Sequence, residues 1–327
     1  MTNIFITGAT GFIGSYLVEH LSQNPDNIIY GLHRSIKYES TFNALKIYEK
    51  ENVNTILGDV TNTLKIQEII SNNDIDQIYH LAAQPIVQKA SLTPISTYNT
   101  NVYGTLSILE SVRSMSRQLN KEIVTFVMGT DKSYGTSDIL PYTEDLPLNG
   151  LDIYSSSKAC QDIIARTYFH NYNLPIVIAR PSNTYGIDFQ WSRLIPSLAK
   201  SCFKSQNKPL ILNKGSFHQI REYTYVKDLV KAIYLLVHNI DETKGNSYNI
   251  SSECKYTTED VVHKFLELTN TKKIIDFKEK ESTFKEIPEQ CLNTNKLKSV
   301  IKWSPSYNLE SGLKETIEKY KEWFKIN

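Results

Sequence analysis

Two side chains four residues apart, Tyr154 and Lys158, are of types and spacing that could do chemistry together. On a helix, positions i and i+4 share one face. A phenol normally loses its proton near pH 10, but a neighbouring ammonium and a cationic cofactor ring both favour the phenolate. A phenolate is a suitable base for removing a hydroxyl proton while a hydride leaves the same carbon. Alone, such a pair arises by chance in a chain rich in tyrosine and lysine, but together with the glycine-rich loop near the start of the chain it predicts a redox site that acts on an alcohol.

A second candidate group is Thr130-Asp131-Lys132, which follows the apolar run Ile123–Met128 after one glycine, Gly129. In open parallel sheets the chemistry lies at the carboxyl ends of the strands, where these residues would sit. Thr130 could hydrogen-bond a reacting oxygen. Asp131 and Lys132 could act as acid and base on neighbouring carbons of a substrate, although a surface ion pair on a turn is the alternative interpretation.

A glycine-rich loop near the start of the chain has the spacing G-x-x-G-x-x-G, between an expected strand (Asn3–Thr7) and an expected helix (Ile13–Ser22). In this context one glycine permits a tight turn, another lets backbone N–H groups approach a pyrophosphate, and the last lets the helix pack against the strand. The helix dipole favours the phosphates. We expect cofactor contacts from Gly8, Gly11, Phe12, Ile13 and Gly14.

The segment after the second expected strand, Ile28–Leu32, bears on which nicotinamide dinucleotide binds. An acidic residue there would select NAD, but the chain continues His33-Arg34-Ser35 and has no carboxylate at this point. Arg34, with Ser35, could instead hold a 2′-phosphate. We therefore favour NADP, with NAD as the alternative if Arg34 is a solvated loop residue. Further cofactor contacts are expected from Asp59, Val60, Leu81, Ala82, Ala83 and the pair Tyr154 and Lys158.

The elements that must position these residues alternate between strands and helices. Such alternation predicts an α/β fold with a doubly wound parallel (Rossmann) sheet and a smaller C-terminal α/β lobe. We expect residues 1–178 plus about 219–245 to bind the dinucleotide, and about 179–218 and 246–327 to form the lobe. The expected elements include strands at Thr55–Leu57, Gln77–Leu81, Pro175–Ala179 and Ser247–Ile250, and helices at Leu64–Ser71, Thr100–Met115, Tyr154–His170 and Leu309–Phe324.

Composition excludes several classes of protein. The 327 residues are 40% hydrophobic and 22% charged, with a net charge of +1, so no general affinity for nucleic acid is indicated. The four cysteines are far apart, which argues against a disulfide scaffold and suits a reducing compartment. No secretory signal or membrane-spanning run is recognised, so we expect a soluble cytoplasmic protein. No histidine has ligand-like spacing, and we expect no metal.

Taken together, these residues resemble the extended short-chain dehydrogenase/reductase superfamily, and within it the nucleotide-sugar 4,6-dehydratases. The resemblance covers nearly the whole chain. Thr130–Lys132 and Asp152–Cys160 are most similar to CDP-glucose 4,6-dehydratase, whereas Gly31–Ser35 resembles GDP-mannose 4,6-dehydratase. The segments that carry the superfamily resemblance are Thr7–Gly14, His80–Gln84, Asn101–Thr105, Tyr154–Lys158, Ala179–Gly186 and Arg221–Asp228.

The resemblance implies a residue-by-residue mechanism. Tyr154 would take the 4-hydroxyl proton as the C4 hydride leaves, and Thr130 would bind the C4 oxygen. Lys132 would be the base at C5, and Asp131 would protonate the departing 6-hydroxyl. It also implies a homodimer through a four-helix bundle of the helices Thr100–Met115 and Tyr154–His170. Expected contacts to the nucleotide-diphosphate hexose are Gln84, Asn183, Arg193 and Arg221, the two arginines for the diphosphate.

Two other functions remain open from the sequence. A nucleotide-sugar 4-epimerase or 4-keto reductase/dehydrogenase would need Tyr154 and Lys158 but would have no use for Asp131 and Lys132 as acid and base. A catalytically silent, cofactor-binding regulatory protein is the remote alternative.

Overall fold

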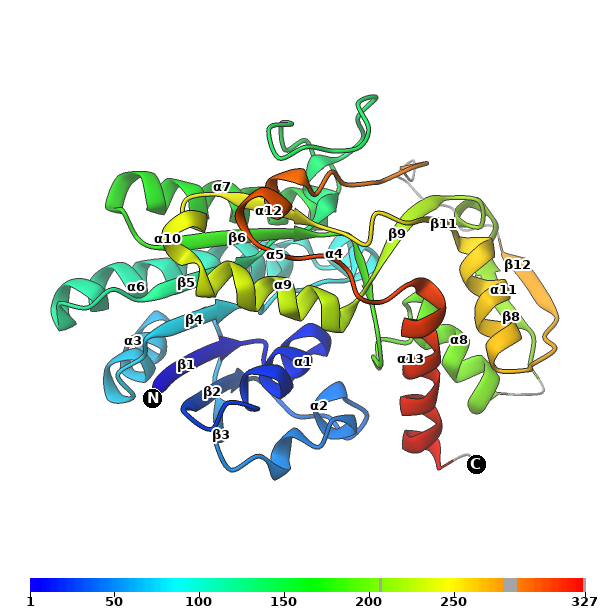
Figure 1. The fold of residues 1–327 in the computed structure, drawn as a ribbon, viewed down its shortest axis with the longest axis horizontal. Coiled ribbons are helices and arrows are strands. Elements are labelled where there is room, and N and C mark those ends of the chain that lie inside the picture. Colours follow the sequence, from blue (N-terminus) through cyan, green and yellow to red (C-terminus); the bar gives the residue numbers. More distant parts are fainter. Residues whose placement is uncertain (206–207, 279–286, 326–327) are drawn as a thin grey trace.

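A seven-stranded parallel sheet forms the centre of the larger part of the molecule, as Figure 1 shows. The computed structural model describes residues 1–205, 208–278 and 287–325. All neighbouring strands of this sheet pair in parallel. In order across the sheet they are β10 (Ser247–Ile250), β6 (Ile176–Pro181), β5 (Val124–Met128), β4 (Gln77–His80), β1 (Thr2–Thr7), β2 (Asn27–His33) and β3 (Val53–Leu57).

Helices cover both faces of this sheet because successive strand residues point to opposite faces. On one face Phe126 of β5 belongs to the same buried cluster as Tyr16 of α1. On the other face Val127 belongs to a second cluster with Leu109 of α6. The first face carries α1 (Phe12–Leu21) and α9 (Val226–His238), and the second α3 (Thr63–Asn72), α6 (Gly104–Leu119) and α7 (Ile153–Tyr172). The predicted doubly wound α/β fold is confirmed.

Among the described residues, the smaller lobe contains two minor sheets and three longer helices, on the right of Figure 1. Leu198, Val261 and Leu313 of its helices belong to the same buried cluster as Phe126 of the large sheet. The lobe is therefore packed directly onto the cofactor-binding part. Its elements are β7 (Asn183–Tyr185), β9 (Ile220–Tyr225) and β11 (Lys255–Thr257) in one sheet, β8 (Leu210–Asn213) and β12 (Ile275–Lys278) in the other, with α8 (Leu194–Phe203), α11 (Thr258–Leu268) and α13 (Leu309–Phe324).

Short elements connect these larger ones. They are α2 (Thr41–Ala44), η1 (Ile47–Glu49), α4 (Val87–Leu92), α5 (Pro94–Tyr98), the π-helical turn η2 (Asn99–Tyr103), the 3₁₀ turn η3 (Asp131–Tyr134), η4 (Lys214–Ser216), α10 (Ile240–Thr243) and α12 (Asn295–Val300). No helix in the described ranges is both long and apolar enough to cross a membrane.

The division of the chain between the two parts differs from the prediction at two places. The strand Ser247–Ile250 was expected in the lobe, but as β10 it pairs with β6 at the edge of the large sheet. The segment Ile220–Tyr225 was expected in the cofactor domain, but as β9 it pairs with β7 and β11. In both cases the prediction was wrong about which strand the segment pairs with. The residues of a strand do not by themselves specify its hydrogen-bonding partner.

Candidate active site

The glycine loop has the geometry of a dinucleotide cradle. Gly8 has φ +73°, and a Cβ there would lie 2.9 Å from the backbone nitrogen of Ala82. A Cβ on Gly14 would lie 2.1 Å from the carbonyl oxygen of Gly8. Gly11 caps the start of α1 without a side-chain hydrogen bond, so the first N–H groups of the helix can serve a phosphate. The loop thus fits the predicted pyrophosphate of a nicotinamide dinucleotide.

A cavity of about 410 Å³ opens beside this loop. It is lined by side chains of the cofactor part and of the lobe together. All five predicted catalytic residues line it, as do four further predicted cofactor contacts and two predicted substrate contacts: Thr130, Asp131, Lys132, Tyr154, Lys158, Phe12, Ile13, Leu81, Ala83, Asn183 and Arg193. Asp188 and Tyr223 also line the cavity, although the sequence did not single them out.

Helix α7 brings Tyr154 and Lys158 to the cavity. Asp152 caps its N-terminus by accepting hydrogen bonds from the backbone N–H groups of Tyr154 and Ser155, at 3.0 Å each. Burial raises the pKa of Tyr154 to about 12, while a hydrogen bond with Thr130 and the charge of Arg193 lower it. The predicted lowering of this pKa by Lys158 is not found, because burial dominates and the lysine has other partners.

Lys158 is 2% exposed, and its ammonium donates to the carbonyl oxygen of Met128 and to Oε1 of Gln161. Burial lowers the pKa of Lys158 to about 7, although the nearby carboxylate of Asp162 opposes that shift. The lysine therefore titrates close to neutral pH in the folded protein.

The lowered pKa of Lys158 predicts that the ligand-free protein becomes more stable between pH 7 and pH 10. In the unfolded chain a lysine keeps its proton up to about pH 10.4, whereas in the folded protein Lys158 loses it above about 7. Over that window the unfolded state binds more protons, so the free energy of unfolding rises with pH. Urea denaturation of the protein and of Lys158→Met across this range measures the difference. An identical pH dependence in the two proteins would contradict the prediction.

The turn after β5 places the second group of side chains. Asp131 is 3% exposed, and its Oδ1 accepts a hydrogen bond from the Thr130 hydroxyl at 3.2 Å. The Lys132 ammonium is directed elsewhere and lies 3.3 Å from Oε1 of Gln290, which is buried. Asp131 and Lys132 thus have separate partners and both face the cavity, which argues against a surface ion pair.

The guanidinium of Arg193, which was predicted to bind the diphosphate, contacts groups on more than one side of the cavity. Its guanidinium lies 3.1 Å from the carboxylate of Asp188 and 5.9 Å from the centre of the Phe12 ring. Its charge is also one of the factors that lower the pKa of Tyr154. Arg193 therefore lies where the glycine loop, the tyrosine and the lobe meet.

Two predicted substrate contacts do not reach this cavity. Arg221 is buried, and its guanidinium donates to the carbonyl oxygens of Ile220, Ile287 and Pro288. Gln84 bonds to Ile86 through both ends of its amide. Both side chains hold their own chain in place, so the structure does not support their predicted roles.

The residues predicted near the adenosine lie apart from the main cavity. Arg34 and Asp59 line a second, open cavity of about 550 Å³, together with Thr61 and Asn99. Asp59 also accepts hydrogen bonds from the backbone N–H and the hydroxyl of Thr61, at 2.9 and 2.8 Å. Ala82 packs against Gly8, whereas Ser35 and Val60 line neither cavity.

Buried polar residues behind the site have structural partners. Both ring nitrogens of the buried His80 are hydrogen-bonded, to the hydroxyl of Thr7 at 2.8 Å and to that of Thr105 at 3.0 Å, so this histidine has a structural role. Asn101, in the π turn, accepts from the backbone N–H of Gln84 at 2.7 Å and donates to the Ser157 hydroxyl at 2.9 Å. Asn101 therefore connects the segment after β4 to α7.

Comparisons with known proteins agree with this geometry over the full chain. The family model described as GDP-mannose 4,6 dehydratase matches residues 5–316. A dTDP-glucose 4,6-dehydratase from Haemophilus influenzae is 28% identical over 98% of both chains. The crystal structure of a dTDP-glucose 4,6-dehydratase from Bacillus anthracis in complex with NAD is 29% identical, with a TM-score of 0.85 over 99% of both chains. A UDP-glucuronic acid 4-epimerase from Bacillus cereus shares the fold, at 24% identity and a TM-score of 0.87 over 98% of this chain and 100% of the other.

Proposed function

Because this chain belongs to the GDP-mannose 4,6-dehydratase family, and is therefore a nicotinamide-dependent nucleotide-sugar 4,6-dehydratase, we propose which of its residues carry the reaction. The observation that supports the assignment is that Tyr154, Lys158, Thr130, Asp131 and Lys132 line one cavity beside the glycine loop. When bound, the nicotinamide accepts a hydride from C4 of the sugar and later returns it to C6.

The first step falls to Tyr154 and its neighbours. Tyr154 takes the proton of the 4-hydroxyl, and Thr130 holds the C4 oxygen by a hydrogen bond. The raised pKa of Tyr154 means that nearby positive charge must favour the phenolate during this step. Arg193 supplies part of that charge.

The elimination falls to the turn after β5. A 4-ketone acidifies the C5 hydrogen, which Lys132 removes as base. Asp131 gives a proton to the 6-hydroxyl, which leaves as water. The acid must carry a proton and the base must lack one, and the two side chains have separate partners, Thr130 for Asp131 and Gln290 for Lys132.

We further propose a pyrimidine nucleoside diphosphate glucose as substrate. Thr130–Lys132 and Asp152–Cys160 resemble CDP-glucose enzymes, and full-length relatives are dTDP-glucose 4,6-dehydratases. The test incubates the protein with dTDP-, CDP- and UDP-glucose and with GDP-mannose and follows product mass. Loss of one water without net cofactor consumption is expected with a pyrimidine nucleotide. Turnover of GDP-mannose alone would overturn the choice of base, and an isomerised sugar of unchanged mass would overturn the assigned roles.

For the cofactor we propose NADP. Arg34 is exposed at the end of β2 and lines the second cavity with Asp59, and no carboxylate lies in the segment 31–35. The Bacillus anthracis relative was crystallised with NAD, so a direct test is needed.

Replacement of Arg34 by alanine is expected to weaken NADP binding by roughly 10- to 100-fold and to leave NAD binding nearly unchanged. A hydrogen bond to a charged group contributes about 1.5–3 kcal/mol, which corresponds to that factor. Titration calorimetry of the stripped protein measures both affinities, with Arg117→Ala on the surface of α6 as control. Tighter binding of NAD than NADP by the unaltered protein would contradict the proposal.

We also propose that the protein is a homodimer joined through α6 and α7. Leu109 and Val112 of α6 are buried in the core, so they are not available to a partner. Apolar side chains that remain exposed on the neighbouring elements are Leu92, Ile95, Tyr103 and Ile163. Sedimentation equilibrium tests this, and a monomer at micromolar concentration would overturn it.

A further inference from the structure

A buried arginine of β6, Arg180, lies behind the catalytic residues and contacts three other elements. Its side chain is 2% exposed. Its Nε donates to Oδ2 of Asp162 and its Nη2 donates to Oδ1, at 2.9 Å each. Asp162 lies one turn beyond Lys158 on α7. Nη2 also donates to the Ser247 hydroxyl of β10 at 3.1 Å. The guanidinium is thus fixed on the side of the catalytic helix.

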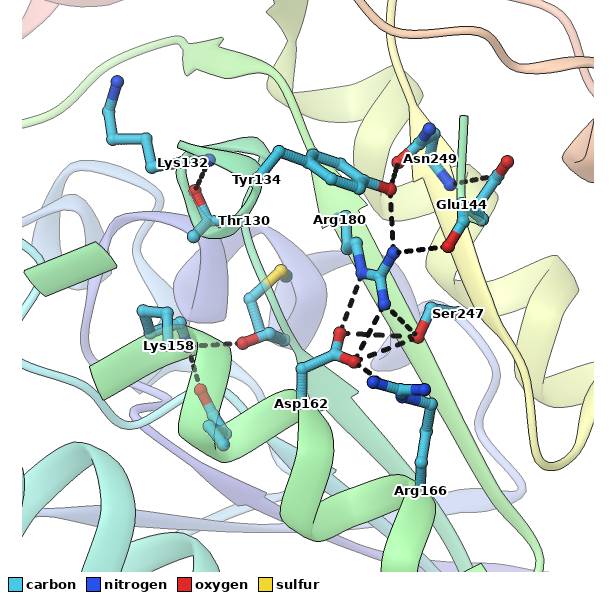
Figure 2. A network of polar contacts seen from close by, with 12 residues as sticks. Thr130, Lys132, Tyr134, Glu144, Lys158, Asp162, Arg166, Arg180, Ser247 and Asn249 are labelled. Atoms are coloured by element: carbon cyan, nitrogen blue, oxygen red, sulfur yellow. Dashed lines mark hydrogen bonds and ion pairs between the residues drawn. The ribbon is translucent and has the colours of Figure 1, made fainter. Parts of the chain in front are cut away.

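The same guanidinium also reaches the end of the catalytic turn. Nη1 donates to the hydroxyl of Tyr134 at 2.8 Å, and the guanidinium carbon lies 5.0 Å from the centre of the Tyr134 ring. Tyr134 is the last residue of η3, the turn that begins at Asp131. Figure 2 shows Arg180 between Asp162 on one side and Tyr134 on the other.

The hydroxyl of Tyr134 has a second hydrogen-bond partner besides Arg180. This hydroxyl donates to Oδ1 of Asn249 at 2.7 Å, and the backbone N–H of Asn249 donates to Glu144 at 2.8 Å. The start of the turn is fixed on β6, where Gly129 N–H donates to the carbonyl oxygen of Ala179, at 2.6 Å. Both ends of the segment 129–134 are therefore fastened to β6, one through its backbone and one through Arg180.

We propose that Arg180 and Tyr134 are positioning residues for the elimination step. Asp162 and Arg180 connect the helix of Tyr154 and Lys158 to the turn of Asp131 and Lys132, so they set the distance between the groups that oxidise C4 and those that act on C5 and C6. A displacement of about 1 Å can cost roughly 100-fold in rate. The inference rests on the proposed roles of the turn.

Tyr134→Phe tests the inference with least disturbance. It keeps the ring over Arg180 and removes only the hydroxyl, and Arg180 Nη1 keeps the Glu144 carbonyl as partner, at 3.2 Å. We expect kcat to fall roughly 10- to 100-fold with little change in KM. We also expect bound reduced nicotinamide to accumulate after mixing with substrate, because oxidation at C4 continues while elimination is slow. Loss of activity with a lowered melting temperature and no such accumulation would overturn the proposal.

Two further variants separate the possible failures. Arg166 pairs with the same Asp162 at 3.0 Å but is 40% exposed and lies on the outer side of α7, so Arg166→Gln is the matched control with unchanged kcat. Asp131→Asn is the reference for a defect in elimination. If Asp131→Asn accumulates reduced nicotinamide and Tyr134→Phe does not, the positioning role is refuted while the proposed function stands. If neither variant accumulates reduced nicotinamide, the roles proposed for Asp131 and Lys132 are wrong, and the positioning role falls with them.

Discussion

Tyr154→Phe should abolish nearly all turnover while leaving the fold and cofactor binding intact. The hydroxyl is the group proposed to take the 4-hydroxyl proton, and a positioned acid or base contributes about 100- to 10,000-fold in rate. Phenylalanine keeps the ring that is buried at the start of α7, so packing is preserved. After mixing with substrate, near-ultraviolet absorbance measures the reduction of the nicotinamide, and product mass measures the loss of water.

The variant should produce neither product nor reduced nicotinamide, since it is blocked before any hydride leaves C4. Tyr172→Phe, at the other end of the same helix, is the control. Tyr172 is exposed, and a phenylalanine would keep its stacking with Arg113, so activity should be unchanged. If Tyr154→Phe still reduced the nicotinamide at the rate of the unaltered protein, another group would have to be the base.

Much of this arrangement could be predicted because it depends on local chemistry. The glycine spacing, the strand before it and the helix after it are adjacent in the chain, and steric demands at Gly8 and Gly14 leave few other residues possible. The helix Leu309–Phe324 was predicted to the residue, since its hydrophobic period is uninterrupted. Thr130–Lys132 could be placed at the site because a parallel strand ends just before it.

Other features depend on partners far away in the chain, which a single sequence does not reveal. Arg221 was expected at a diphosphate, but its guanidinium is held by the carbonyl oxygens of residues 287 and 288. Asp188 lines the cavity through a loop without a recognisable motif. Burial decides the pKa of Tyr154 and of Lys158, and burial follows from the assembled fold.

Arg180 illustrates the same limit. The role of an arginine on a buried strand cannot be predicted until its contacts are known. The partners of Arg180 come from positions 134, 162 and 247, far apart in the chain. The resemblance covered its segment, Ala179–Gly186, yet indicated nothing about its contacts.

Asp131→Asn and Lys132→Met should each stop the reaction after the first hydride transfer, with turnover reduced roughly 100- to 10,000-fold. Asparagine keeps the shape of Asp131 but cannot supply the proton for the departing 6-hydroxyl, and methionine keeps the length of Lys132 without its amine. Tyr154 is unaltered in both, so bound reduced nicotinamide should rise toward one per active site. Lys65→Met, on the exposed face of α3, is the control.

Substrate recovered from D₂O separates the roles of the two residues. In Asp131→Asn the base is intact, so C5 should exchange its hydrogen for deuterium before the hydride returns to C4. In Lys132→Met no group removes that hydrogen, and the recovered sugar should carry no deuterium. The opposite pattern would mean that Asp131 is the base and Lys132 the acid, and exchange in both would require a base outside the turn. The proposed roles predict the first pattern, and the two side chains line the same cavity with separate partners, Gln290 for Lys132 and Thr130 for Asp131.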